Sequence, residues 1–140
     1  MFFRKKKTQT RIPVRRMVVL ARQAADGVIT YAKSCHPNEG ILILQGKHKE
    51  NTTFITGLVI PPFSTHGPFY SGFSGYELPF DLSYIGTVHS HPSGSMRPSL
   101  EDLHNYFGVV SLIISHPYDY QTISAFDRNG NSLDLEISAE

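Results

Sequence analysis

The chain has 140 residues, 40% of them hydrophobic, which is enough to bury the core of one globular domain and too few for two. Its formal net charge is only +1, but residues 1–16 hold seven of the thirteen lysines and arginines and none of the twelve acids. Residues 17–140 therefore carry a formal charge of −6, so the sequence predicts a basic N-terminal arm over 1–16 and an acidic domain over 17–140.

Several classes of protein are excluded by the same composition. No apolar run approaches the ~20 residues that span a bilayer, and the N-terminus lacks the apolar segment of a signal peptide. The single cysteine, Cys35, excludes an intramolecular disulfide and suits a reducing compartment. We therefore expect a soluble, cytoplasmic protein that makes no membrane contact. Its basic arm suits contact with an acidic protein surface or with nucleic acid, or serves only solubility.

The first half of the chain predicts one helix followed by strands. Apolar residues recurring among polar ones indicate a helix over about 18–34, which ends before His36-Pro37. A continuous apolar run over 39–46 has the pattern of a strand buried on both faces. Another strand is expected over 52–60, where Pro61-Pro62 stops it.

The segment 67–76 alternates glycines with aromatic residues. Two interpretations stay open for it. The first is a loop that its rings pin to the domain, because aromatic side chains beside glycine commonly serve packing. The second is a mobile flap that clamps an extended peptide.

The second half predicts a strand from Tyr84, a helix from near Ser99 that Gly108 ends, and strands over 109–115 and 121–126. An Asn129-Gly130 turn then leads to a strand over 132–137, which makes a hairpin. The predicted fold is a single α/β domain with a mixed, mainly antiparallel sheet flanked by helices.

The most informative residues follow the strand that begins at Tyr84. His89 and His91 alternate with Ser90, so in an extended chain both imidazoles project to the same face. Pro92 and Gly94 break the strand, and a loop leads to Ser99 and then to Asp102 in the first turn of the predicted helix. This spacing suits one divalent metal ion held by His89, His91 and Asp102.

A donor set of imidazole and carboxylate without thiolate suits zinc, with iron or manganese as alternatives. Three protein ligands leave a fourth position open, as in catalytic rather than structural zinc sites. The chemistry that this favours is hydrolysis by a metal-activated water.

Such a mechanism also needs a general base and a donor for the developing oxyanion. Among the acids upstream of the histidines we favour Glu39, because its place at the entry of a buried strand would partly desolvate it and raise its pKa. Those acids are Asp26, Glu39, Glu50, Glu77 and Asp81. For the oxyanion we favour the hydroxyl of Ser99. A plainer role for Ser99 is a capping box with Asp102, and both roles are compatible.

Glu39, His89-Ser90-His91-Pro92, Ser99 and Asp102 together resemble the signature of the JAMM/MPN+ zinc metalloproteases. The resemblance covers roughly residues 17–137 and is closest to compact prokaryotic and archaeal members. It implies a fold like that of cytidine deaminase. It also implies one zinc ion per chain bound by His89, His91 and Asp102, with Glu39 activating the water and Ser99 supporting the tetrahedral intermediate.

The other histidines have simpler explanations. His104 follows Asp102 by two residues, which on a helix places it on a different side. The rest stand in expected loops or turns as surface residues: His36, His48, His66 and His116. Cys35 beside His36 is a weak candidate nucleophile, because adjacent residues seldom reach the geometry that such a pair requires. We expect a small, at least partly buried side chain there.

The function expected from this resemblance is cleavage of an isopeptide or peptide bond at the C-terminus of a ubiquitin-like modifier, with conjugates of such modifiers as partners. Two alternatives stay open. One is a peptidase that trims a short extension from a sulfur-carrier protein. The other is a non-catalytic, metal-containing binding or assembly module that contacts nucleic acid through the arm, since bacterial relatives linked to DNA repair share a His-x-His-Pro-Ser-Gly loop.

Overall fold

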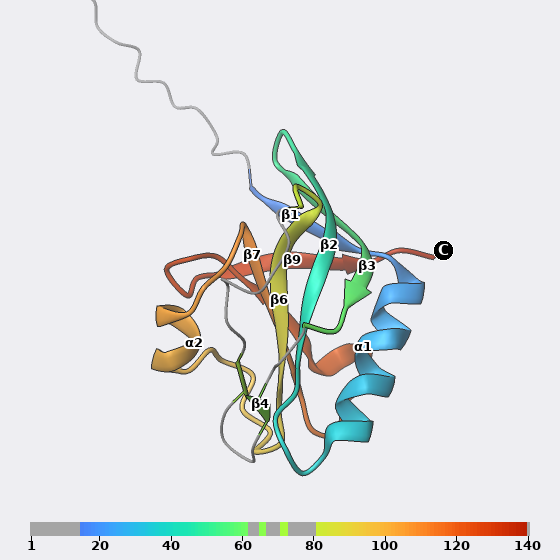
Figure 1. The fold of residues 1–140 in the computed structure, drawn as a ribbon. Coiled ribbons are helices and arrows are strands. Elements are labelled where there is room, and N and C mark those ends of the chain that lie inside the picture. Colours follow the sequence, from blue (N-terminus) through green and yellow to red (C-terminus); the bar gives the residue numbers. More distant parts are fainter. Residues whose placement is uncertain (1–14, 62–64, 67–70, 73–80, 140) are drawn as a thin grey trace, which may run out of the picture.

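The computed structural model describes residues 15–61, 65–66, 71–72 and 81–139. Within them, one mixed sheet closes on itself in the order β1-β3-β2-β6-β7-β8-β9 (Figure 1). Its strands are β1 (Met17–Leu20), β2 (Ile41–Lys49), β3 (Thr52–Val59), β6 (Tyr84–His91), β7 (Val110–Ser115), β8 (Ile123–Phe126) and β9 (Ser132–Ile137). Four neighbouring pairs are antiparallel, whereas β6–β7 and both pairs of β1 are parallel. The predicted single α/β domain with a mixed, mainly antiparallel sheet is confirmed.

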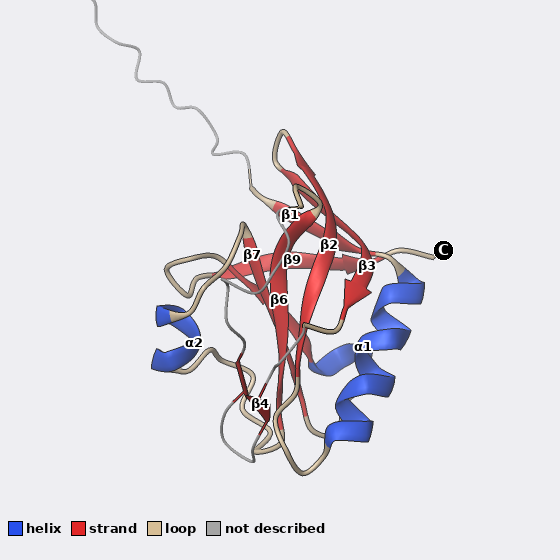
Figure 2. Cartoon of the chain, viewed as in Figure 1, coloured by secondary structure: helices blue, strands red, loops and turns tan. Residues whose placement is uncertain are grey.

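Two helices flank this sheet on different sides, as Figure 2 shows: α1 (Arg22–Cys35) and α2 (Leu100–His104). The short strands β4 (Thr65–His66) and β5 (Ser71–Gly72) form a separate antiparallel pair. The aromatic segment 67–76 lies outside the described residues apart from β5, so its role stays a prediction.

The predicted helix over 18–34 is wrong at its start. Residues 17–20 form β1, which pairs in parallel with both β3 and β9 and so closes the sheet. Val18 and Leu20 are fully buried there, and α1 begins only at Arg22. Met-Val-Val-Leu fits an apolar helix face and a strand equally well, and β-branched residues favour the strand once partners exist on both sides.

The alternation of side chains along the strands gives the sheet two differently used faces. Leu42 and Val88 pack with Leu112 in the main core, under the apolar side of α1. Helix α1 contributes buried residues spaced along one stripe, namely Ala24, Ala25, Val28 and Ala32. The neighbours in register, Ile41, His89 and Ile113, therefore lie on the opposite face. The histidines thus project to the side of the sheet away from α1.

Two predicted elements near the C-terminus are shorter than expected. Helix α2 ends at His104 instead of continuing to Gly108. A 3-10 turn occupies Tyr120–Thr122, so β8 begins at Ile123 rather than at residue 121. The hairpin predicted around Asn129-Gly130 is confirmed, because β8 and β9 pair antiparallel across it.

The boundary predicted between arm and domain is not tested, because residues 1–14 lie outside the described part. Arg15 forms an exposed ion pair with Asp134 of β9, and Arg16 hydrogen-bonds to the domain. Neither α1 nor α2 has the length and apolar character needed to cross a membrane.

Candidate metal centre

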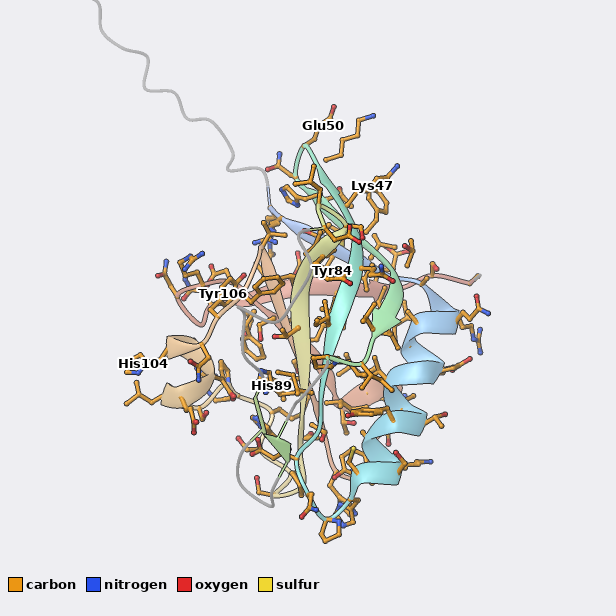
Figure 3. All side chains as sticks on the ribbon, viewed as in Figure 1. Lys47, Glu50, Tyr84, His89, His104 and Tyr106 are labelled. Carbon is orange, nitrogen blue, oxygen red and sulfur yellow. The ribbon has the colours of Figure 1, made fainter. Side chains whose placement is uncertain are left out.

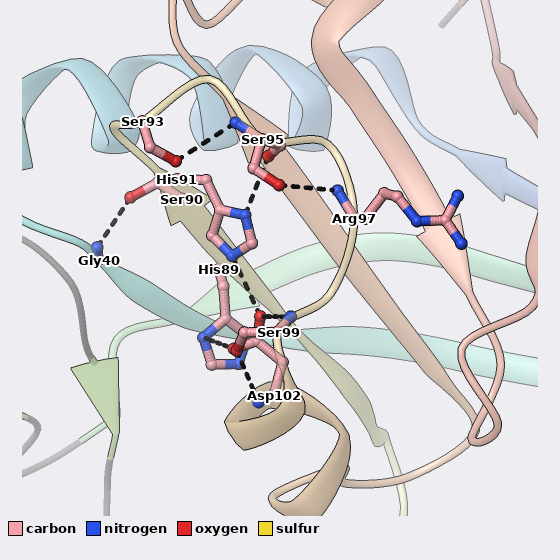
Figure 4. Close-up of polar contacts among 9 residues, drawn as sticks. All are labelled: Gly40, His89, Ser90, His91, Ser93, Ser95, Arg97, Ser99 and Asp102. Atoms are coloured by element: carbon pink, nitrogen blue, oxygen red, sulfur yellow. Dashed lines mark hydrogen bonds and ion pairs between the residues drawn. The ribbon is translucent and has the colours of Figure 1, made fainter.

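Strand β6 ends with both candidate histidines. Its first residue is half-buried and the next seven are buried, including His89 and His91, whose side chains are only 6% and 7% exposed. Strand β6 lies between β2 and β7, with His89 opposite Ile41 and Ile113. Both imidazoles approach the carboxylate of Asp102, so the prediction that they share one face is confirmed (Figure 4).

Glu39 lies beside this strand end, although β2 begins two residues later than predicted. The amide of Gly40 donates to Ser90 Oγ over 2.8 Å, and the amide of Ser90 donates to the Gly40 carbonyl over 3.0 Å. Continuing the β2–β6 register by two residues places Glu39 opposite His91. The half-buried carboxylate is near enough for its charge to act on His91.

Asp102 is held at the start of α2 by a capping box. The hydroxyl of Ser99 accepts from the Asp102 amide over 3.0 Å, and Asp102 Oδ2 accepts from the Ser99 amide over 2.9 Å. The sequence interpretation of 99–102 as a capping box is therefore confirmed. The cap also directs the carboxylate back toward β6, where its side chain is only 9% exposed.

The contacts of His91 require a proton or a metal ion at its Nε2 atom. Nδ1 lies 2.9 Å from the Ser95 carbonyl, which only accepts, so Nδ1 carries the proton. Nε2 then holds its lone pair 3.1 Å from Asp102 Oδ2, itself an acceptor. Either a second proton or a metal ion must stand between two such acceptors. Imidazoles that bind metal commonly donate their other N–H to a carbonyl in this way, so the donor set fits a divalent cation.

The pKa values of the three groups follow from the same contacts. Burial alone would lower the pKa of His91, but the hydrogen bond and charge of Asp102, the Ser95 carbonyl and Glu39 outweigh it and raise that pKa. Burial also dominates at His89, whose pKa is lowered despite Asp102, so His89 is neutral and able to act as a ligand at pH 7. At Asp102, burial opposes ionisation, yet His91, His89 and the Ser99 amide together lower the pKa to about 2.

Asp102 hydrogen-bonds to His91, whereas its Oδ1 lies 3.7 Å from His89 Nδ1, beyond hydrogen-bond distance. Among the described residues, no group of three or more His, Cys, Asp or Glu side chains already surrounds a common point as in a formed metal site.

The remaining histidines lie elsewhere. His104 is exposed in the last turn of α2 and projects away from His89 (Figure 3). His36 and His116 are exposed, and their rings stack 5.0 Å apart near Tyr118, which hydrogen-bonds to His36. His48 lies in β2 and not in a loop as predicted, although it is exposed.

Sequence reasoning missed the residues that position the centre. Ser90 links β6 to the backbone next to Glu39, and Ser95 orients His91. Cys35 packs against Gly40, where a Cβ would come within 2.8 Å of its Sγ, so this cysteine has a packing role. The signal for Ser90 was present, because a small hydroxyl side chain buried in a strand needs a hydrogen-bond partner.

Comparisons with known proteins agree with this geometry. Residues 21–129 match the profile of a family described as prokaryotic homologues of the JAB domain. The chain is 31% identical over 130 residues to a probable metalloprotease of Haloferax volcanii, an alignment that covers 88% of this chain and 81% of that protein.

Solved structures give the same result. A JAB1/MPN domain protein from Archaeoglobus fulgidus superimposes with a TM-score of 0.63 and 33% identity, covering 84% of this chain and 96% of that one. A structure described as a JAMM, a metalloprotease-like zinc site in the proteasome and signalosome, has a TM-score of 0.62 and 28% identity, covering 87% and 98%. A Desulfitobacterium hafniense protein with a TM-score of 0.68 is 20% identical, covers 89% of this chain and 94% of its own, and shares the fold.

Proposed function

Because the chain belongs to the family of prokaryotic JAB-domain homologues, we propose that it is a zinc-dependent hydrolase. Its reaction is cleavage of an isopeptide or peptide bond at the C-terminus of a ubiquitin-like modifier protein. The probable metalloprotease of Haloferax volcanii and the metalloprotease-like zinc site of a structural relative support the chemistry. The choice of a ubiquitin-like substrate comes from the sequence resemblance to the JAMM signature.

The observation that carries the proposal is the meeting of His89, His91 and Asp102 beside Glu39. These residues come from the end of β6, the start of α2 and the segment before β2, and the two imidazoles are almost fully buried around one carboxylate. His89, His91 and Asp102 would hold one zinc ion. A structural zinc site is usually closed by four protein ligands, whereas this set has three and an adjacent acid.

A zinc ion held here would supply a Lewis acid able to make water nucleophilic at neutral pH. Glu39 takes a proton from the attacking water and then delivers it to the leaving amine, so that one carboxylate acts first as base and then as acid. Continuing the β2–β6 register places Glu39 opposite His91, beside the groups where this shuttle is needed.

Ser99 donates to the developing oxyanion in this scheme. In the capping box, Ser99 Oγ accepts a hydrogen bond from the Asp102 amide through a lone pair. The hydroxyl proton of Ser99 is therefore still able to donate. The same cap fixes Ser99 and the ligand Asp102 relative to each other, so the donor is positioned before substrate arrives.

The test is cleavage of two matched substrates by protein loaded with zinc. One is a ubiquitin-like protein joined through its C-terminal glycine to a lysine side chain. The other is a sulfur-carrier protein with a short extension after its Gly-Gly end. Mass spectrometry identifies each product, and a chelator arm followed by added zinc controls for the metal.

Release of the intact modifier from lysine, lost with chelator and restored with zinc, is the expected result. Cleavage of the short extension alone would favour the sulfur-carrier peptidase. Failure of zinc-loaded protein on both substrates, or cleavage that ignores the chelator, would contradict the proposal.

A further inference from the structure

A second site lies at the opposite end of β6 and β7 from the candidate metal centre. A cavity of about 370 Å³ opens there, lined by Arg16, His48, Tyr106, Gly108, Val109, Asp127, Arg128 and Asn129. The amide of Val109 donates to the Ile85 carbonyl near the start of β6, whereas the metal centre is at the end of that strand. Tyr106, which lines this cavity, and His89 of the metal centre are both labelled in Figure 3. None of the lining residues belongs to the centre.

Arg16 is a half-buried cation with only neutral hydrogen-bond partners in the described structure. Its Nη2 donates to Thr53 Oγ1 over 3.1 Å and to the Val109 carbonyl. Its Nε is buried and hydrogen-bonds to no described group. Among the described residues, no carboxylate lies within ion-pair distance of Arg16. The Arg16 charge acts on Asp127 and helps to lower the pKa of that carboxyl. The two groups form no ion pair, so the half-buried guanidinium still favours an anion in the cavity.

Arg128 and His48 add donors around the same cavity. The Cζ of Arg128 lies 5.0 Å from the centre of the Tyr106 ring, a cation–π contact that holds this guanidinium beside the cavity. His48 Nδ1 pairs with Thr53 Oγ1 at 2.7 Å, which leaves Nε2 on the other side of the ring. Three side chains able to donate to an anion therefore surround one cavity.

The acid that lines the cavity, Asp127, accepts hydrogen bonds from within its own turn. Its carboxylate accepts from the amides of Asn129 and Asn131 at 2.9 Å each, and from Asn131 Nδ2 at 3.3 Å. These bonds shape the turn that carries Arg128. Asp127 thus reduces the local positive charge without closing the site with an ion pair.

We propose that this cavity, the Arg16–Arg128 pocket, binds a phosphate group, either free or in the backbone of a nucleic acid. A phosphate offers several oxygens to fork-shaped guanidinium donors, which favours two arginines over a single point charge. Residues 1–14 carry five further lysines and arginines and lead directly into Arg15 and Arg16. In the sequence, this run of cations directly precedes Arg16, which suits a ligand that repeats its charge. This inference does not depend on the proposed hydrolase activity.

The experiment uses the full chain and two matched variants. Arg128→Gln removes a pocket cation that lies over a tyrosine, and Arg22→Gln removes the same kind of pair on α1, where Arg22 lies 5.6 Å from the centre of the Tyr120 ring. The probes are inorganic phosphate, followed by calorimetry, and a short fluorescent single-stranded oligonucleotide, followed by anisotropy at several salt concentrations. A glutamate-rich peptide tests the alternative of an acidic protein. Thermal melting checks that each variant folds.

We expect wild type to bind phosphate, and Arg128→Gln to weaken phosphate and oligonucleotide binding about tenfold while Arg22→Gln matches wild type. Tighter, strongly salt-dependent oligonucleotide binding would identify a nucleic-acid backbone as the source, and equal affinities would identify free phosphate. Three results would overturn the proposal: no binding of either phosphate probe, equal effects of the two variants, or a glutamate-rich peptide that phosphate fails to displace.

Discussion

The two ends of the parallel strands β6 and β7 differ in charge and in burial. At the carboxyl ends, two nearly buried imidazoles surround one carboxylate, a donor set for a cation. At the amino ends, two arginines and a histidine line an open cavity, a donor set for an anion. The two sites draw on different segments. His89 and His91 belong to β6 itself, whereas Arg16 precedes β1 and Arg128 lies in the turn between β8 and β9.

Strand β6 separates the pocket from the metal centre, and the distance between them follows from the length of this strand. Ile85 and His89 are four residues apart in β6, or roughly 13 Å at the rise of a strand. The strand is buried along almost its whole length and paired on both sides, and the sheet closes through β1. A ligand at one end is thus expected to leave the geometry of the other unchanged. The predictions below test the roles assigned to residues at each end.

The largest effect in turnover is expected from Glu39→Gln. The amide keeps the shape of the side chain but does not shuttle a proton, so the turnover number should fall about 10²- to 10⁴-fold while zinc stays bound. Steady-state kinetics with zinc analysis measures both quantities. The matched control is Glu101→Gln, an exposed neighbour of Asp102 on α2. Near-normal turnover of zinc-loaded Glu39→Gln would remove Glu39 from the mechanism.

Ser99→Ala should lower the turnover number by about 10²- to 10³-fold if the hydroxyl stabilises the oxyanion. The same change removes the cap of α2 and costs about 1 kcal/mol of stability. Ser99→Gly separates the two effects, because glycine is a better cap than alanine but has no hydroxyl either. Equal losses of turnover in both variants support the donor role, whereas turnover that follows the unfolding free energy would leave only the cap.

Much of the carboxyl-end site could be predicted from sequence, because its signals are local. Alternation placed His89 and His91 on one face, and the Ser99 to Asp102 spacing predicted the capping box. The amino-end pocket could not be predicted, because Arg16 and Arg128 are 112 positions apart and meet only through the closure of the sheet. The strand at 17–20 was missed for the same reason, since its pairing partners β3 and β9 are distant in the chain.

Ser90→Ala tests how Glu39 is positioned. The buried hydroxyl of Ser90 accepts the amide of Gly40, next to Glu39, so its loss should lower the free energy of unfolding by about 1–2 kcal/mol and reduce turnover with zinc retained. Urea denaturation and kinetics measure the two effects. Ser93→Ala in the following loop removes an exposed hydroxyl and should change stability by less than about 0.5 kcal/mol. Equal stability of the two variants would argue against the anchoring role.

The smallest expected effect is on stability and comes from Arg15, the neighbour of Arg16. Arg15 and Asp134 form an ion pair at 3.0 Å, but their side chains are 77% and 41% exposed. Arg15→Ala should therefore cost no more than about 1 kcal/mol, and the loss should shrink as salt screens the pair. Chemical denaturation at low and high salt measures it. A larger, salt-independent loss would show that Arg15 stabilises the domain through packing.

The most direct test of the central claim is the zinc content of purified protein, measured by elemental analysis for wild type, His89→Ala and His104→Ala. His104 is exposed on the far side of α2 and serves as the matched control. The account predicts one zinc per chain in wild type and in His104→Ala, and its loss in His89→Ala with the fold retained. Folded wild type that takes up no zinc, or zinc that persists in His89→Ala, would contradict the assignment of this centre.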